Sequence, residues 1–359
     1  MKRTHNFSAG PASLPLEVLE TAQKELLDYR GTGTSIMEVS HRGKEYTEVD
    51  QEARERLTRI LGLGNDFEVL FLQGGASTQF MQVPFNFLND DETADYINTG
   101  AWSQKAIKEA KLFGNVNIPF SGEKDNFVHI PTQNELSLTP EARYVHFTSN
   151  NTIFGTQFHT EPETNGVPLV CDASSDFLSR PIDIQKYGVI YAGAQKNLGP
   201  AGVTVVIVRK DFLQDVSRTD IPTIMKYKTH AEKLFHTPPT FAVYLVNLVL
   251  KWVEEKGGVS YFQDINTKKA ELLYSTIDSD DFYTGTTEAE SRSKMNVTFR
   301  LPSEELEQTF LADAKDQDLV ALKGHRSVGG IRASIYNACT MESVEVLTDF
   351  MKDFRAKQG

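Results

Sequence analysis

The chain has 359 residues, 40% of them hydrophobic, and a formal net charge of −12. This length predicts two domains, at roughly 100–200 residues per domain. The acidic balance disfavours nucleic-acid binding, which requires a basic surface. Two cysteines, Cys171 and Cys339, are too few for a disulfide framework or a zinc-binding set.

The apolar segments of the sequence predict a cytoplasmic protein. The first residues lack the apolar run of a signal peptide. The longest apolar stretch, 241–253, is interrupted by Asn247 and Lys251. It is shorter than the roughly 20 apolar residues that span a bilayer. We therefore expect neither a targeting segment nor a membrane anchor.

Hydrophobic periodicity predicts alternating helices and strands through the first part of the chain. The expected elements in chain order are a helix at 15–29, a helix at 47–61, strands at 68–72, 94–98, 144–148, 169–171, 189–192 and 203–208, and a helix at 241–255. Such alternation is typical of an α/β fold in which helices flank both faces of a mostly parallel sheet.

The pattern changes after Gly257-Gly258. A strand is expected at 294–300, a helix at 303–314 and a strand at 331–336. We therefore predict a large domain over 16–258 and a smaller α+β domain over 259–359. Residues 1–15 are expected to form an N-terminal segment that packs with the small domain.

Lys196 is the leading candidate for a catalytic residue. It follows the apolar run 189–192 and precedes the Gly199-Pro200 break. A lysine at the end of a buried strand can lose solvation, which lowers its pKa and favours the neutral amine that forms a Schiff base. Another apolar run ends at Asp172, and an acid there can keep the pyridine nitrogen of pyridoxal phosphate protonated. The pair alone is equally compatible with an aldolase-type lysine.

Two further segments fit a phosphorylated, planar ligand. Gly74-Gly75-Ala76-Ser77 lies at a strand-to-helix switch, where backbone N–H groups can hold a phosphate. An ordinary glycine-rich turn is the alternative interpretation. Trp102 follows a predicted strand and can stack on a ring at that edge of the sheet, or serve as a core residue.

Two His-Arg pairs next to glycine indicate anion binding. They are His41-Arg42 and His325-Arg326, and Arg332 follows the second pair. Arginine binds carboxylate and phosphate groups in a bidentate manner. Surface ion pairing is the alternative for either pair taken alone.

Taken together, these segments resemble the phosphoserine aminotransferases, a class V family of fold-type I pyridoxal-phosphate enzymes. The matching stretches are 6–11, 37–42, 71–77, 172–177, 191–197 and 324–330, in family order. The resemblance covers essentially the whole chain. It implies a mostly parallel seven-stranded sheet flanked by helices, a smaller C-terminal α+β domain, and no metal.

The resemblance implies a role for each matching residue. Lys196 would form the Schiff base and carry the proton, Asp172 would pair with the pyridine nitrogen, and Trp102 would stack on the ring. The other implied cofactor contacts are Ala76, Ser77, Thr152 and Gln195. Arg332 would bind the substrate α-carboxylate. The residues implied for the substrate phosphate or side-chain carboxylate are His41, Arg42, His325 and Arg326.

The implied reaction converts L-glutamate and 3-phosphohydroxypyruvate to 2-oxoglutarate and O-phospho-L-serine, in serine biosynthesis. The family is homodimeric, and His236 and Thr237 would reach the partner subunit's cofactor phosphate. His236 replaces the asparagine that is usual there, in a loop that is also shorter than usual.

Within the same fold, the alternative functions are a cysteine desulfurase and another small-substrate aminotransferase. A desulfurase needs a cysteine on a mobile loop, and Cys339 is a better candidate than Cys171, which lies in an apolar run. A non-catalytic cofactor-binding protein is a further alternative, and the retained lysine, aspartate and arginines argue against it.

Overall fold

The computed structural model describes residues 3–216 and 218–359. Its centre is a seven-stranded sheet of strand order β2-β10-β9-β8-β5-β3-β4. Only β10 runs antiparallel to its neighbours within this sheet. The strands are β2 (Phe67–Leu72), β3 (Thr93–Tyr96), β4 (Asn115–Asn117), β5 (Val145–Thr148), β8 (Leu169–Asp172), β9 (Tyr187–Gly193) and β10 (Thr204–Arg209). The predicted mostly parallel sheet is confirmed.

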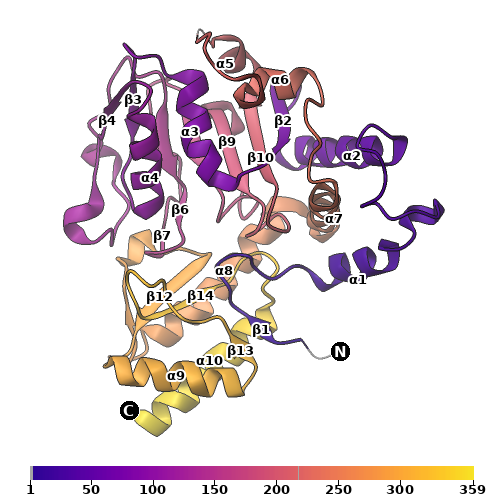
Figure 1. The fold of residues 1–359 in the computed structure, drawn as a ribbon. Coiled ribbons are helices and arrows are strands. Elements are labelled where there is room, and N and C mark those ends of the chain that lie inside the picture. The colour runs from indigo at the N-terminus through magenta and orange to yellow at the C-terminus, as the bar shows by residue number, and fades with distance from the viewer. Residues whose placement is uncertain (1–2, 217) are drawn as a thin grey trace.

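Helices cover both faces of this sheet (Figure 1). Helices α3 (Gly75–Phe87) and α4 (Ala101–Ala110) lie on one face, and α2 (Lys44–Leu61) and α7 (Thr240–Lys256) on the other. Alternate side chains of β2 enter different cores: Leu70 packs on the α3 side, whereas Val69 packs on the α2 side. This alternation follows from the two-residue period of a strand. Buried on both faces, the sheet holds the residues at its strand ends in fixed positions.

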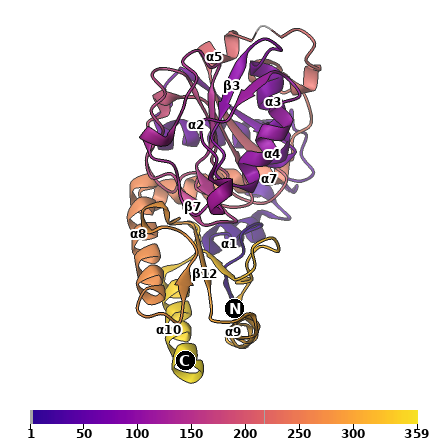
Figure 2. The ribbon, with the colours of Figure 1, turned by 90° about the vertical axis from the view of Figure 1, so that its left-hand side faces the viewer.

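A second, smaller sheet lies below the first and has its own hydrophobic core (Figure 2). It consists of β11 (Thr284–Gly285), β12 (Asn296–Arg300) and β14 (Ile331–Ser334). Helices α8 (Gly258–Ile277), α9 (Glu304–Asp316) and α10 (Met341–Gln358) surround it. Phe262 at the start of α8 packs into the large core, and Leu273 near its end packs into the small one. The division near residue 258 stays a prediction, since α8 contributes to both cores.

The N-terminal residues lie beside elements from distant parts of the chain. Strand β1 (His5–Asn6) pairs in parallel with β13 (Leu319–Val320). A few residues later, the Ala12 N–H donates to the Gln195 carbonyl at 2.8 Å. The segment between these contacts therefore runs from β13 to the residue preceding Lys196.

The remaining helices and strands are α1, α5, α6, β6 and β7. Helix α1 (Leu16–Glu25) ends earlier than the predicted range 15–29, and Leu27 beyond it is 86% exposed. Helices α5 (Lys210–Gln214) and α6 (Tyr227–Glu232) follow β10, and β6 (Asn150–Asn151) pairs with β7 (Thr156–Gln157).

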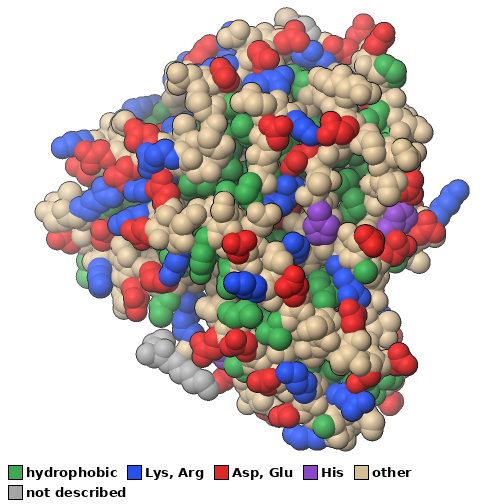
Figure 3. Space-filling model, turned by 180° about the vertical axis from the view of Figure 1, so that it is seen from behind, with side chains coloured by type: hydrophobic (Ala, Val, Ile, Leu, Met, Phe, Trp, Pro, Cys, Tyr) green, Lys and Arg blue, Asp and Glu red, His purple; other side chains and the backbone are tan. Residues whose placement is uncertain are grey.

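In the part of the chain that the structure describes, no helix has the length and apolar character needed to cross a membrane. Acidic and basic side chains are interspersed over the face in Figure 3.

Candidate active site

Lys196 lies just beyond the end of β9, at the edge of the sheet where the parallel strands end. Its Nζ donates a hydrogen bond to Thr152 Oγ1 at 2.7 Å. Burial lowers the pKa of Lys196 to about 8; the Asp172 charge opposes that shift and the Arg332 charge adds to it. A large fraction of this amine is therefore neutral slightly above neutral pH, as nucleophilic and proton-transfer chemistry requires.

Asp172 is the last residue of β8, the strand next to β9, and is 4% exposed. The backbone N–H and the hydroxyl of Ser174 donate to its Oδ1 at 3.0 and 2.6 Å. Burial raises the pKa of Asp172, while Ser174 and Lys196 oppose this shift. Ser174 Oγ also accepts from the Gly193 N–H, so it ties the acid to the end of β9. Ser174 is not among the site residues predicted from the sequence.

A cavity of about 240 Å³ brings most of the predicted cofactor residues together. Its lining includes Gly74, Gly75, Ala76, Ser77, Trp102, Asp172, Gln195 and Lys196. Lys196 Nζ lies 5.7 Å from the centroid of the Trp102 ring. The Trp102 Nε1 is buried, with no hydrogen-bond partner among the residues described. An amine, an acid and an aromatic ring thus face the same space.

The glycine-rich turn forms another wall of this cavity. Gly74 and Gly75 have φ values of 91° and 65°, a region that glycine adopts without strain. A Cβ on Gly74 would lie 1.8 Å from Thr78 Oγ1, so only glycine fits there. The turn leads into α3, whose first N–H groups have no intrahelical acceptor and can bind an anion.

These residues fit pyridoxal phosphate. The anion-binding start of α3, the Trp102 ring, the Asp172 carboxyl and the Lys196 amine match its phosphate, ring, pyridine nitrogen and aldehyde in turn. Thr152 lies on the other side of the lysine, where its carbonyl accepts from Arg332 Nη1 at 3.1 Å. Arg332, on β14, is partly buried, and burial lowers its pKa.

The predicted anion-binding residues do not all meet in this cavity. His41 and His236 line a separate cavity of about 400 Å³ between α2 and the segment around α6. His230 also lines it, and its ring centroid lies 5.1 Å from that of His236. Burial lowers the pKa of His236, with His230 and His41 adding to the effect. The exposed Gln73 side chain donates a hydrogen bond from its Nε2 to the Thr237 carbonyl oxygen at 3.5 Å.

The second His-Arg pair lies elsewhere again. His325 lines a third cavity, of about 340 Å³, together with residues of β12 and β14. Arg326 and Arg42 are both exposed. Within one chain His41 and His325 therefore line different cavities, and none of the residues of the two His-Arg pairs lines the cavity of Lys196.

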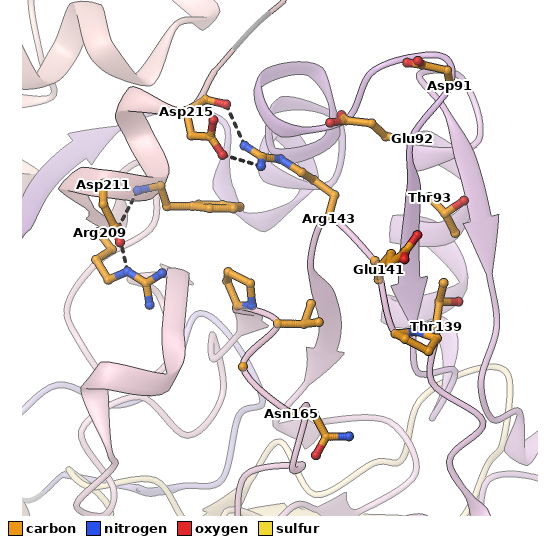
Figure 4. Close-up of a pocket in the computed structure, with 16 residues that line it drawn as sticks. Asp91, Glu92, Thr93, Thr139, Glu141, Arg143, Asn165, Arg209, Asp211 and Asp215 are labelled. Atoms are coloured by element: carbon orange, nitrogen blue, oxygen red, sulfur yellow. Dashed lines mark hydrogen bonds and ion pairs between the residues drawn. The ribbon is translucent and has the colours of Figure 1, made fainter.

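The most voluminous of these cavities, about 1020 Å³, lies at the opposite edge of the central sheet (Figure 4). Its lining residues, including Thr93, Arg143 and Arg209, lie at the starts of parallel strands or at the end of antiparallel β10. Arg143 pairs with Asp215 and Arg209 with Asp211, so both cations are engaged. It therefore offers no counterpart to the amine and acid of the smaller cavity.

Both cysteines are buried. Cys171 lies within β8 at 2% exposure, and Cys339 is 7% exposed. Burial raises the pKa of both thiols, which keeps them protonated. A thiol in that state is a poor nucleophile, so the desulfurase alternative loses its candidate residue.

The fold and this site are matched by a known family. The family model for class-V aminotransferases matches residues 4–347. The chain therefore belongs to the class-V aminotransferases, which confirms the predicted fold class.

Individual relatives narrow this assignment. The chain is 57% identical to the phosphoserine aminotransferase of Desulfatibacillum aliphaticivorans and 53% identical to that of Bacillus subtilis, with 99% of each chain covered. The solved phosphoserine aminotransferase of Bacillus circulans subsp. alkalophilus superposes with a TM-score of 0.97 at 52% identity, over 100% of both chains. A pyridoxal-phosphate-bound structure from Trichomonas vaginalis superposes at 0.93, with 42% identity over 98% of this chain and 100% of the other. Within its class, the chain belongs to the phosphoserine aminotransferase family.

Proposed function

We propose that this chain transfers the amino group of L-glutamate to 3-phosphohydroxypyruvate, giving 2-oxoglutarate and O-phospho-L-serine. The observation that carries the proposal is the placement of Lys196 and Asp172 in one cavity with Trp102 and the glycine-rich turn. The full-length identity to phosphoserine aminotransferases supports the choice of substrates. The product places the enzyme in serine biosynthesis.

The cofactor is pyridoxal phosphate. Its aldehyde links to an amine as a Schiff base and its protonated ring withdraws electrons from the substrate α-carbon. Lys196 provides the amine, Asp172 holds the ring nitrogen, and Trp102 stacks on the ring. Ala76, Ser77 and Gln195 bind the phosphate, and the Thr152 hydroxyl orients the lysine through its 2.7 Å hydrogen bond.

Proton transfer is the task of Lys196. With the cofactor bound, the Lys196 amine would be the group that removes the α-proton of the substrate. An amine with a pKa of about 8 can accept this proton and return it near neutral pH, because both protonation states are populated. In the second half of the reaction, the same group delivers a proton to the carbon that becomes the α-carbon of phosphoserine.

Cationic side chains select the substrates. Arg332 binds the α-carboxylate common to both amino acids. Its Nη1 contact with the Thr152 carbonyl holds the guanidinium close to the lysine. His41, Arg42, His325 and Arg326 form the set that receives either the glutamate side-chain carboxylate or the substrate phosphate.

This cationic set can act together only if two chains cooperate. His41 and His236 line a cavity separate from that of Lys196 within one chain. We propose a homodimer in which His236 and Thr237 reach the partner subunit's cofactor phosphate, and in which the His-Arg pairs converge across the interface. We further propose that the dimer functions in the cytoplasm with small-molecule substrates alone.

The two hydrophobic cores and the β1–β13 pairing support the proposed domain division. Residues 16–258 would form the large cofactor-binding domain and 259–359 the small domain. The predicted N-terminal segment 1–15, of which residues 1–2 lie outside the described residues, would associate with the small domain through β1, which pairs with β13.

A half-reaction assay tests the proposed function. Glutamate added to the cofactor-loaded protein should change the cofactor absorption band and release one 2-oxoglutarate per site. 3-Phosphohydroxypyruvate should then restore the band, whereas pyruvate should not. An unchanged band after glutamate addition would refute transamination, and restoration by pyruvate alone would refute the choice of substrate.

A further inference from the structure

Lys269 is a completely buried lysine outside the candidate active site. It lies on α8 and is 0% exposed. Its Nζ donates three hydrogen bonds to backbone carbonyls, those of Ile335 at 2.9 Å, Tyr336 at 2.8 Å and Cys339 at 2.9 Å. No carboxylate forms an ion pair with it among the residues described. A buried cation without a counter-ion is costly, so its retention calls for a compensating role.

The three carbonyls belong to a single turn that follows β14. They match the three N–H bonds of an ammonium group, and a neutral amine would turn a lone pair toward one of them. Burial lowers the pKa of Lys269 to about 8, so the ammonium form still predominates at neutral pH. The lysine therefore fixes the conformation of residues 335–339 from inside the small domain.

This turn contacts the large domain next to the catalytic lysine. The Asn337 backbone N–H donates to Asn197 Oδ1 at 2.9 Å, and Asn197 directly follows Lys196. The Asn337 amide donates to the Leu178 carbonyl at 2.9 Å. Asn266, three residues before Lys269 on α8, donates to Asn337 Oδ1 at 2.8 Å. Two buried hydrogen bonds, connected through the Tyr336–Asn337 peptide, thus join Lys269 to the segment that carries Lys196.

We propose that Lys269 is a positioning residue for Lys196: its ammonium group holds the turn 335–339, and Asn337 of that turn holds Asn197 and so fixes the backbone that carries the catalytic amine. The same turn continues β14, which carries Arg332. Lys269 therefore sets the distance between the proton-transferring amine and the arginine that binds the substrate carboxylate. The inference rests on the proposed role of Lys196.

Lys269→Met tests this role, because methionine preserves the volume and removes the three donors. A small displacement of a reacting group lowers rates by roughly 10- to 100-fold. We expect a fall of that size in kcat, with the KM for glutamate changing by less than about threefold. In the cofactor-free variant, the rate at which Lys196 captures added pyridoxal phosphate, followed by absorbance, should fall in parallel.

A double-mutant cycle separates positioning from loss of stability. Asn197→Ala removes the acceptor through which Lys269 acts, so Lys269→Met should lower kcat by no more than about twofold further in that background. Leu273→Ala is the matched control, since Leu273 is fully buried on the same helix and packs only in the small core. It should lower the melting temperature and leave both rates within about twofold of the parent.

Additive effects of Lys269→Met and Asn197→Ala, or a Lys269→Met protein with parental rates, would overturn the proposal. If Lys269→Met fails to fold, the same cycle is run with Lys269→Gln, which keeps two donors and should show a smaller loss of the same kind. A Lys196→Ala protein that turns over normally would instead refute the proposed function itself, which keeps the two failures distinguishable.

Discussion

The surroundings of Lys196 and Lys269 form an instructive pair. Burial lowers the pKa of each lysine to about 8. Lys196 has one side-chain acceptor, feels the charge of a nearby carboxylate, and lines a cavity. Lys269 has three carbonyl acceptors and is completely buried. A lowered pKa therefore does not by itself identify a catalytic amine. A catalytic amine must also be accessible from a cavity and must have hydrogen-bonding capacity left for a ligand.

Removal of the Lys196 amine should have the largest effect on activity. We expect Lys196→Ala to lower single-turnover formation of 2-oxoglutarate by at least roughly 10²- to 10⁴-fold, because the proton carrier is lost. The control is Lys251→Ala, an exposed lysine on α7 that lies near Glu255. Full turnover by Lys196→Ala would show that the Lys196 amine is no more catalytic than the buried Lys269 amine.

The two lysines should differ in the opposite sense for stability. Lys269→Met leaves three buried carbonyls without a hydrogen-bond donor. We therefore expect the free energy of unfolding of the cofactor-free protein to fall by about 3 kcal/mol. Lys196→Met breaks only one hydrogen bond and removes a charge that burial disfavours, so its free energy of unfolding should change by less than about 1 kcal/mol. Urea denaturation measures both. Equal losses of unfolding free energy in the two variants would mean that the surroundings of Lys196 and Lys269 stabilise the fold equally.

The pH dependence of cofactor capture should report the neutral fraction of Lys196. Below a pKa of about 8 the neutral amine declines roughly tenfold per pH unit, so the capture rate should fall with it and level off above pH 8. Asp172→Asn removes a charge that raises this pKa and should move the midpoint to lower pH. Arg332→Met removes a charge that lowers it and should move the midpoint to higher pH. Stopped-flow absorbance measures the capture rates. Midpoints that shift in the same direction in both variants would contradict the predicted opposite shifts.

His236 extends the comparison to a third, half-buried base, with the smallest expected effect. Its lowered pKa makes it a neutral hydrogen-bond donor at pH 7.5. We expect His236→Asn, which keeps an N–H donor, to change the affinity for pyridoxal phosphate by less than about threefold. His236→Ala should weaken it by roughly fivefold to tenfold. Equal affinities for the alanine and asparagine variants would exclude a phosphate contact.

The grouping of residues around Lys196 was largely predictable because these residues terminate regular elements. Lys196 and Asp172 each follow an apolar run, and parallel strands bring such positions to one edge. Gly74 was recognisable because a strand-to-helix turn requires a residue of positive φ. The family resemblance supplied the substrate, which no local pattern contains.

Lys269 and Ser174 could not be found in the same way. Lys269 follows the exposed Lys268, and the pair reads as an ordinary solvated helix surface. Its burial depends on a turn about seventy residues later, which no periodicity reveals. Ser174 is one of two adjacent serines, and only the side-chain geometry distinguishes it as the partner of Asp172. The sequence could not predict the relative positions of His41, Arg42, His325 and Arg326 either, because these positions depend on tertiary structure.

The pairing of β1 with β13 has a consequence for biosynthesis. During translation the first strand emerges long before the residues with which it pairs, which lie near the end of the chain. The segment that follows β1 passes beside Lys196, and a Cβ on Gly10 would lie 3.5 Å from the lysine Cγ. This segment cannot be held in place by β13 until almost the whole polypeptide has left the ribosome. Newly made chains should therefore acquire pyridoxal phosphate stably only after synthesis is complete.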